Sequence, residues 1–236
     1  MAGRRTYGSY DDGCAAAHAL DIIGERWSMS IVRELLLGPK RFAALQRDVV
    51  GIGPTILARR LDGLASKGVL RRTKQGGDGV GNSYELTEWG YRLEHVNAAL
   101  AEWGAQSMTL PLDAAMTPDT IVLAMRAHID KTARGAKPRR VLLKVRDARD
   151  AEAPAVNYLA SQTSQGLEIL RLQHDASPDV DAIVACSTEA LKRVIIAGGA
   201  WDRGDADVRI SGDPVAVGEL MEATRFRTSD SVGSSI

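Results

Sequence analysis

The pattern of apolar positions in the first seventy residues predicts four short helices. Within each segment apolar side chains recur every three or four residues, as they do on one face of an amphipathic helix. Gly24 would end the first helix and Gly38-Pro39 the second, while Pro54 suits the first turn of the fourth. The helices are expected at residues 15–23, 26–37, 42–49 and 54–67.

After the fourth helix the pattern changes to two short strands and a long helix. Residues 69–74 and 83–86 predict strands, joined by a glycine-rich run that makes a flexible hairpin tip. Thr87 can cap the helix that follows. Apolar residues of that helix have the spacing of a coiled-coil seam and predict a homodimer: Leu93, Val96, Leu100 and Trp103.

This order of elements is that of a winged helix-turn-helix with an added dimerisation helix, although an unrelated small α+β domain is an alternative. Two runs are the most specific, ALDIIGERW at residues 19–27 and RELLLGPKRF at residues 33–42. Other matching positions are Cys14, Gly51, Ile52, Gly53, Pro54, Leu57, Arg60, Leu61, Leu64, Gly68, Tyr84, Leu86 and Thr87. In these residues and their order the sequence resembles the HxlR family of transcription regulators. Gly53 departs from the Ser or Thr that is common in the family, which weakens the cap of the next helix.

The resemblance implies that residues 54–67 form a recognition helix, whose N-terminal part enters the major groove. Arg59 is the first candidate for a base contact, because its planar fork can pair with guanine. Thr55 can meet a phosphate or a base, and Ala58 can touch a thymine methyl group. The expected partner of such a homodimer is double-stranded DNA with a pseudo-palindromic operator.

Further candidate DNA contacts flank this helix. Arg60 is expected either to contact a phosphate or to form an internal ion pair. Lys40 and Arg41 are expected to grip the DNA backbone. Lys74 and Asn82 flank the wing tip, where plain exposure to solvent is the alternative.

The charge distribution supports a local phosphate-binding face. The chain has 30 basic and 30 acidic residues, but residues 26–75 hold eleven Lys or Arg and three acids. Such a run is also typical of a solvated face. General binding to polyanions is therefore not expected.

The two cysteines, Cys14 and Cys186, are far apart and predict neither a disulfide nor a zinc site. Cys186 lies in an apolar run and is expected in a core. Cys14 has two interpretations, a small buried residue or the oxidant-sensing thiol that the family resemblance implies. The adjacent helix start favours a thiolate, but Asp11 and Asp12 are expected to raise the thiol pKa, which favours the buried interpretation.

The second half predicts a separate α+β domain. Helices are expected at residues 118–134, 188–196 and 214–221, and strands at residues 141–145, 167–172 and 182–186. Residues 178–184, Leu191, 198–201 and 208–214 resemble sterol-carrier-protein-2-like (SCP2-like) domains over about half of this region. The resemblance implies an apolar pocket between sheet and helices, lined by the first helix and the first two strands. A filled core with a structural role is the alternative.

The expected organisation is a winged helix-turn-helix domain at residues 1–108, a linker at 109–117, an SCP2-like domain at 118–227 and a disordered tail at 228–236. The start lacks the apolar core of a signal peptide, and no stretch approaches a membrane span, so a cytoplasmic protein is expected.

The four histidines are scattered and no catalytic motif is present, so neither an enzyme, a cofactor nor a metal is expected. The predicted function is sequence-specific transcription regulation, as a repressor, modulated by an apolar ligand or a thiol event. A lipid or small-molecule carrier whose N-terminal half mainly dimerises is the alternative.

Overall fold

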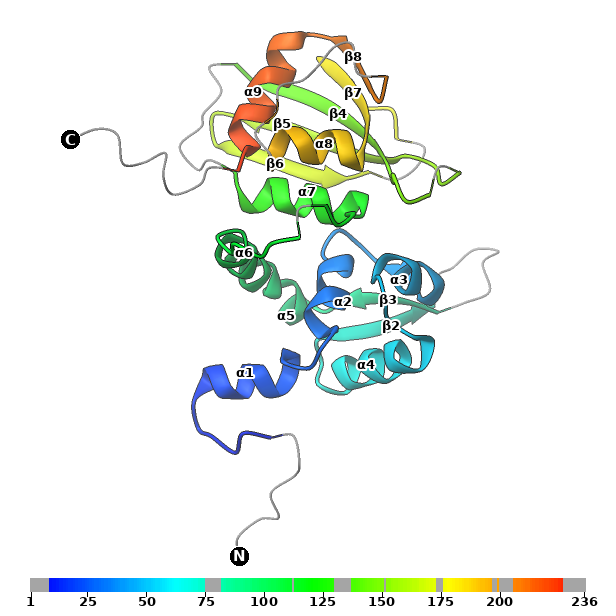
Figure 1. The fold of residues 1–236 in the computed structure, drawn as a ribbon, viewed down its shortest axis with the longest axis vertical. Coiled ribbons are helices and arrows are strands. Elements are labelled where there is room, and N and C mark those ends of the chain that lie inside the picture. The colour runs from blue at the N-terminus through cyan, green and yellow to red at the C-terminus, as the bar shows by residue number, and fades with distance from the viewer. Residues whose placement is uncertain are drawn as a thin grey trace, which may run out of the picture. The chain divides into compact units, whose positions relative to one another are not determined.

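The structure is a computed structural model. It describes residues 9–74, 82–111, 113–129, 137–150, 152–172, 176–196, 199 and 206–226. The chain forms two compact units, Met1–Asn97 and Ala98–Ile236 (Figure 1). The glycine-rich hairpin tip, the side chain of Lys74 and the expected tail at 228–236 lie outside the described residues.

The N-terminal unit combines short helices with a three-stranded antiparallel sheet. Its helices are α1 (Ala15–Ile23), α2 (Ser28–Leu35), α3 (Phe42–Asp48), α4 (Pro54–Ser66) and α5 (Glu88–Tyr91), and α6 (Leu93–Gly104) begins in this unit. Its strands are β1 (Lys40–Arg41), β2 (Leu70–Lys74) and β3 (Asn82–Leu86), in the order β1-β3-β2. The predicted winged helix-turn-helix arrangement is confirmed, and strand β1 is an addition to it.

Helix α4 is amphipathic in the predicted register. Leu57, Leu61 and Leu64 are buried, while Thr55 and Arg59 are exposed on the other side. Burial of three leucines along one stripe fixes the rotation of the helix on the core. The rotation determines which side chains α4 presents to solvent.

The long helix expected after Thr87 is divided into α5 and α6. Thr87 does cap α5, since its hydroxyl accepts a hydrogen bond from the Gly90 backbone N–H at 3.0 Å. A Cβ at Gly90 would lie only 2.0 Å from the carbonyl oxygen of Val69. Helix α5 therefore needs glycine at this position to pack against the start of the wing.

The C-terminal unit contains a five-stranded sheet with the order β6-β5-β4-β7-β8. Strands β4 and β7 are parallel, and the other neighbouring pairs are antiparallel. The strands are β4 (Arg139–Arg146), β5 (Val156–Thr163), β6 (Gly166–Arg171), β7 (Ala182–Ser187) and β8 (Val208–Gly212). Helices α7 (Pro118–Ala127), α8 (Thr188–Ile195) and α9 (Pro214–Thr224) pack on the sheet (Figure 1).

The predicted helices and strands of this unit are present, with two differences. The first helix ends at Ala127 rather than continuing to residue 134, and residues 130–136 lie outside the described part. Strand β5 was not predicted, and β8 lies within residues 208–214, where only the resemblance to SCP2-like domains implies a strand. The α+β class of this half is confirmed.

Asp119 anchors α7 to the sheet from a buried position. It accepts hydrogen bonds from the Tyr158 hydroxyl at 2.6 Å and from the Arg171 guanidinium at 3.0 Å. The largest fully buried side chains of this unit are Ile121, Met125, Leu143, Tyr158, Ile169 and Leu191. Across the described residues, none of the helices has the length and apolar character needed to cross a membrane.

Candidate nucleic-acid interface

The outer face of α4 presents the residues proposed to read bases. Thr55 and Arg59 are exposed and Ala58 is partly exposed, all within the first two turns. Among the described residues, Arg59 forms no ion pair. Its guanidinium is therefore not neutralised by a neighbouring carboxylate. Gly53, the N-cap, provides no side-chain hydrogen bond, as expected from its departure from the family pattern.

Two further candidates are exposed beside the wing. Arg41 ends β1, and Asn82 begins β3, where it pairs with Lys74 in the strand register. The register confirms that positions 74 and 82 lie at the same end of the hairpin. Arg41, Lys74 and Asn82 as DNA contacts stay predictions.

The prediction that Lys40 grips the DNA backbone is wrong. Lys40 is only 7% exposed, and its ammonium donates to a carboxylate oxygen of Glu34 at 2.7 Å and of Asp48 at 2.9 Å. Strand β1 places adjacent side chains on opposite faces, so Lys40 points inward while Arg41 points outward. A buried ammonium held by two carboxylates is not available to phosphate.

In this buried cluster each charged side chain is paired with an opposite charge, which offsets the free energy that it would cost to bury that charge alone. Burial raises the pKa of Asp48, but Lys40 and Arg47 outweigh that effect and hold the pKa below its ordinary value. Arg33 also pairs with Glu34, at 3.1 Å. The cluster therefore joins α2, β1 and α3 through paired charges.

Of the two interpretations of Arg60, the structure shows the internal ion pair. Its guanidinium pairs with the carboxylate of Glu25 and donates through Nε to the carbonyl oxygen of Arg26 at 3.2 Å. The Arg60 side chain is 16% exposed. It connects α4 to the turn between α1 and α2.

Other cations of the basic segment are also paired. Arg71 pairs with Glu85, and Arg72 pairs with Asp62. Within the described part of this segment, Arg26, Arg41 and Arg59 are exposed guanidiniums that form no ion pair, and Arg26 lies over the ring of Trp27. The free positive charge is therefore more local than the sequence count indicates.

The seam residues of α6 are largely exposed in the single chain. Val96, Leu100 and Trp103 have exposed fractions of 39%, 49% and 77%, and Leu93 is partly buried. Neither α6 nor α1 has a buried residue. Apolar helices that bury nothing in one chain are typical of a surface that is covered by a partner.

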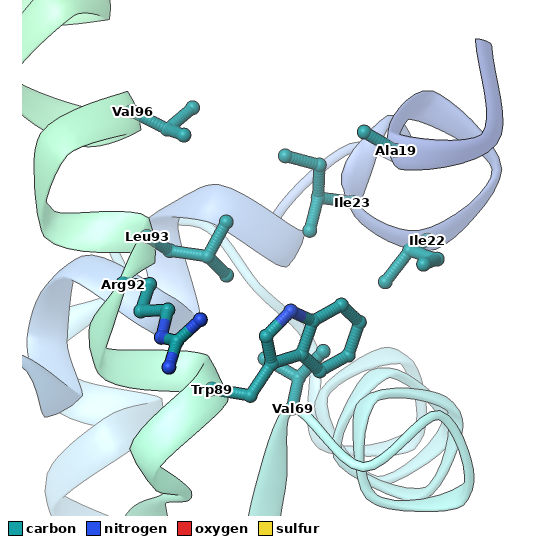
Figure 2. Close-up of a pocket in the computed structure, with 8 residues that line it drawn as sticks. All are labelled: Ala19, Ile22, Ile23, Val69, Trp89, Arg92, Leu93 and Val96. Atoms are coloured by element: carbon teal, nitrogen blue, oxygen red, sulfur yellow. The ribbon is translucent and has the colours of Figure 1, made fainter. Parts of the chain in front are cut away.

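An apolar pocket of about 240 Å³ opens between α1 and the helices α5 and α6 of the N-terminal unit. Figure 2 shows Ile22 and Ile23 of α1 on one side and Leu93 and Val96 on the other, with the ring of Trp89 between them. Arg92 is the charged residue of the lining. Leu93 and Val96 of α6 belong both to the pocket lining and to the predicted seam.

Cys14 is exposed at the N-cap of α1, so the buried interpretation is wrong. The backbone N–H groups of Ala17 and Ala16 lower its pKa below the ordinary value of 9.0, because they stabilise the thiolate more than slight burial opposes it. The argument that Asp11 and Asp12 raise this pKa fails. Cys186 is in the core as expected, and burial raises its pKa to about 12.

Among the described residues, no group of three or more His, Cys, Asp or Glu is placed to hold a metal ion. The apolar cavity expected in the C-terminal unit stays a prediction. Ile121, Met125, Leu143 and Ile169, which are in its expected lining, are fully buried. The pocket in Figure 2 lies in the N-terminal unit instead.

Residues 22–110 match the family model described as HxlR-like helix-turn-helix. An uncharacterized HTH-type transcriptional regulator of Mycobacterium tuberculosis is 34% identical over 100 residues, which are 42% of this chain and 63% of that protein. The uncharacterized HTH-type transcriptional regulator YdeP of Bacillus subtilis is 36% identical over 101 residues, 42% of this chain and 77% of YdeP. The chain belongs to the HxlR-like helix-turn-helix family.

A third relative is the HTH-type transcriptional regulator YodB of Bacillus subtilis, 32% identical over 88 residues, 37% of this chain and 79% of YodB. The structure of its reduced form has a TM-score of 0.37 and covers 41% of this chain and 95% of that one, at 30% identity. YodB has also been solved with bound quinone. These matches concern the N-terminal part of the chain.

Proposed function

We propose that this protein is a homodimeric, sequence-specific DNA-binding transcription regulator that acts as a repressor in the cytoplasm. The observation that carries the proposal is the outer face of α4, where an unpaired Arg59 and the exposed Thr55 are held on a helix fixed by three buried leucines. Membership of a helix-turn-helix family supports the same function. Such a face is suited to the major groove.

Dimerisation is part of this proposal. The exposed apolar residues of α6 and the apolar face of α1 would be covered by the same helices of a second copy. An isologous dimer relates the two α4 helices by a two-fold axis. Each α4 would then read one half-site, and the half-sites would lie about 34 to 36 Å apart.

The test is selection of bound fragments from fragmented genomic DNA with the purified protein. A shared inverted repeat among the recovered fragments is expected. Recovery of DNA without any shared sequence would contradict sequence-specific regulation and favour the carrier function. A reporter under a recovered operator should be transcribed less when the protein is present. Increased transcription would identify the protein as an activator rather than a repressor.

Regulation through the Cys14 thiol is the second part of the proposal. The exposed thiol at the start of α1 and its lowered pKa favour reaction with oxidants or electrophiles. YodB, a relative of this chain, is known in a reduced form and with bound quinone. Modification by a quinone should change operator affinity in the wild type and leave Cys14→Ser unaffected.

For the C-terminal unit we propose an SCP2-like domain that binds an apolar effector. The succession β7, α8, β8 and α9, with Gly212-Asp213-Pro214 at the last junction, supports this resemblance. Asp213 caps α9, since its carboxylate accepts from the Val215 backbone N–H at 2.8 Å. A carrier function that needs no DNA is the alternative use of the same domain.

A further inference from the structure

Residues 21–27, which end α1 and lead into α2, contact the recognition helix and the residues on either side of it at three places. Trp27 adjoins Gly51 just before α4, Arg60 pairs with Glu25 near its middle, and Lys67 donates to the backbone oxygen of Asp21 at its end. We infer that this α1–α4 clamp sets the position of the recognition helix in the dimer. The inference rests on the proposed DNA-binding function.

The middle contact combines an ion pair with a hydrogen bond. The Arg60 guanidinium meets the Glu25 carboxylate and also donates to the Arg26 carbonyl oxygen at 3.2 Å. Two acceptors on successive residues restrict the planar fork to one orientation. Arg60 is therefore fixed to the turn rather than free to reach a phosphate.

The contact before α4 is a packing contact. A Cβ at Gly51 would lie 3.4 Å from Cη2 of Trp27, so the indole ring lies directly against this glycine. Trp27 has a φ of 80°, and the Arg26 guanidinium covers its ring at 4.6 Å. The surrounding contacts hold this residue in an uncommon conformation.

The third contact involves the residue that follows α4. The Lys67 ammonium donates to the carbonyl oxygen of Asp21, whose carboxylate in turn accepts from the Tyr10 backbone N–H at 2.9 Å. Together the three contacts resist both rotation and tilt of α4 relative to α1. Because α1 belongs to the proposed dimer face, the clamp would transmit the dimer geometry to the two recognition helices.

The sharpest test replaces the acid of the middle contact. Glu25→Gln removes a negative charge, and electrostatics alone would leave DNA binding unchanged or strengthen it. A clamp predicts the opposite, an operator affinity about three- to tenfold weaker, because both protomers lose the ion pair. Glu88→Gln, which removes an exposed acid from α5, is the matched control and should not weaken binding.

Substitution of Arg60 distinguishes a role in positioning α4 from a direct contact between Arg60 and DNA. Arg60→Gln should weaken operator binding about as much as Glu25→Gln and leave the dependence of affinity on salt unchanged. Loss of one phosphate contact in each protomer would instead reduce the slope of log affinity against log salt concentration by about two per dimer. Exchange of the two charges, Glu25→Arg with Arg60→Glu, should recover most of the lost affinity. Affinities are compared per active dimer, from stoichiometric titration, so that reduced folding does not count as reduced binding.

Hydrogen exchange of residues 21–27 provides a readout without DNA. The clamp predicts faster amide exchange there in Glu25→Gln than in the wild type or Glu88→Gln. Unchanged exchange, or operator binding by Glu25→Gln as tight as the wild type, would overturn the clamp. If the wild type bound no specific DNA while exchange changed as expected, the proposed function would fail and the structural contact would stand.

Discussion

At the scale of single residues, Arg59 is the side chain whose loss should change sequence preference. Arg59→Ala should reduce operator affinity by about 1 to 3 kcal/mol and relax the preference at one base position in each half-site. The physical reason is loss of an unpaired guanidinium that is exposed on α4. Binding to a set of operators substituted at single positions measures the change.

Two variants provide controls for Arg59. Arg209→Ala removes the same charge from the exposed side of β8 in the other unit and should leave sequence preference unchanged. Lys74→Ala should weaken binding to all sequences alike. If Arg59→Ala changed neither affinity nor preference, this face of α4 would not be the base-reading surface.

Substitution of Lys40 should lower the free energy of unfolding, and Lys40 is not expected to contact DNA. Lys40→Met would leave the buried carboxylates of Glu34 and Asp48 facing each other without the ammonium, at a cost of about 3 to 5 kcal/mol. Arg41→Met, one residue away and exposed, should change stability by less than about 0.5 kcal/mol. Urea unfolding at pH 7 measures both variants.

The stability that this cluster gives to the fold should decrease as the pH falls. Since the folded state lowers the pKa of Asp48, that shift stabilises the wild type above the unfolded value of about 3.9, and the stabilisation is lost as pH falls through the folded pKa. Without Lys40, protonation of a buried carboxylate relieves the repulsion. The difference in unfolding free energy between wild type and Lys40→Met should therefore shrink below pH 4, and a constant difference would contradict this account.

Cys14 and Cys186 should differ strongly in reactivity. The Cys14 thiol is exposed and its pKa is below 9.0, so its alkylation rate should reach half of its maximum below pH 9. Cys186 is buried, with a pKa of about 12, and should react only when the protein unfolds. Peptide mapping after iodoacetamide treatment distinguishes the two sites, and a half-maximum at or above pH 9 would remove the case for an activated Cys14.

At the scale of elements, α6 should hold the dimer together. Leu100→Asp would place a charge in the seam and is expected to give a monomer by sedimentation velocity. Leu170→Asp on β6 is the matched control, because Leu170 and Leu100 have similar exposed fractions of 46% and 49%. A dimeric Leu100→Asp would contradict the seam, and tight operator binding by a monomer would contradict the two-fold mechanism.

Elements with strong local patterns could be predicted from the sequence, and elements that depend on distant partners could not. Helix α1 has the predicted bounds, and Leu57, Leu61 and Leu64 face the core as their spacing requires. Strand β1 has two residues, too few to show a period, so nothing in the sequence indicated that Lys40 faces inward. The carboxylates that pair with Lys40 come from Glu34 on α2 and Asp48 on α3.

Strand β5 shows a second limit of local patterns. From Tyr158 to Gln162 every second residue of this strand is buried. The buried residues include the polar side chains Tyr158 and Gln162, whereas the apolar Leu159 is less buried, so the sequence does not alternate between apolar and polar residues as the burial does. Its pairing with β4 and β6 explains the strand better than its own composition does. The division between α5 and α6 likewise has no glycine or proline at Arg92 to indicate it.

At the scale of the whole molecule, the charge distribution is modified by contacts that the sequence does not show. The basic segment is paired in part by acids from outside it, Glu25 with Arg60 and Glu85 with Arg71. A count along the chain therefore overstates the charge available to DNA. Of the exposed guanidiniums without an ion pair in the described part of this segment, Arg41 and Arg59 lie on β1 and α4, elements that the expected interface includes.

The remaining prediction concerns communication between an effector and DNA. If an apolar compound regulates the protein, it must bind the DNA-competent and DNA-incompetent states with different affinity, because equal affinity shifts neither population. Coupling of about 1 to 3 kcal/mol corresponds to a change of about 5- to 150-fold in operator affinity, and operator DNA must change ligand affinity by the same factor. Both titrations are needed, and DNA without the operator is the control.

The experiment begins with native mass spectrometry of the purified full chain, which should detect a bound apolar compound. That compound is then titrated with and without operator, and the operator is titrated with and without the compound. Equal factors in the two directions are expected because the four states form a closed thermodynamic cycle. Absence of any bindable apolar compound, together with unchanged operator affinity after deletion of residues 118–236, would leave the C-terminal unit with a structural role only.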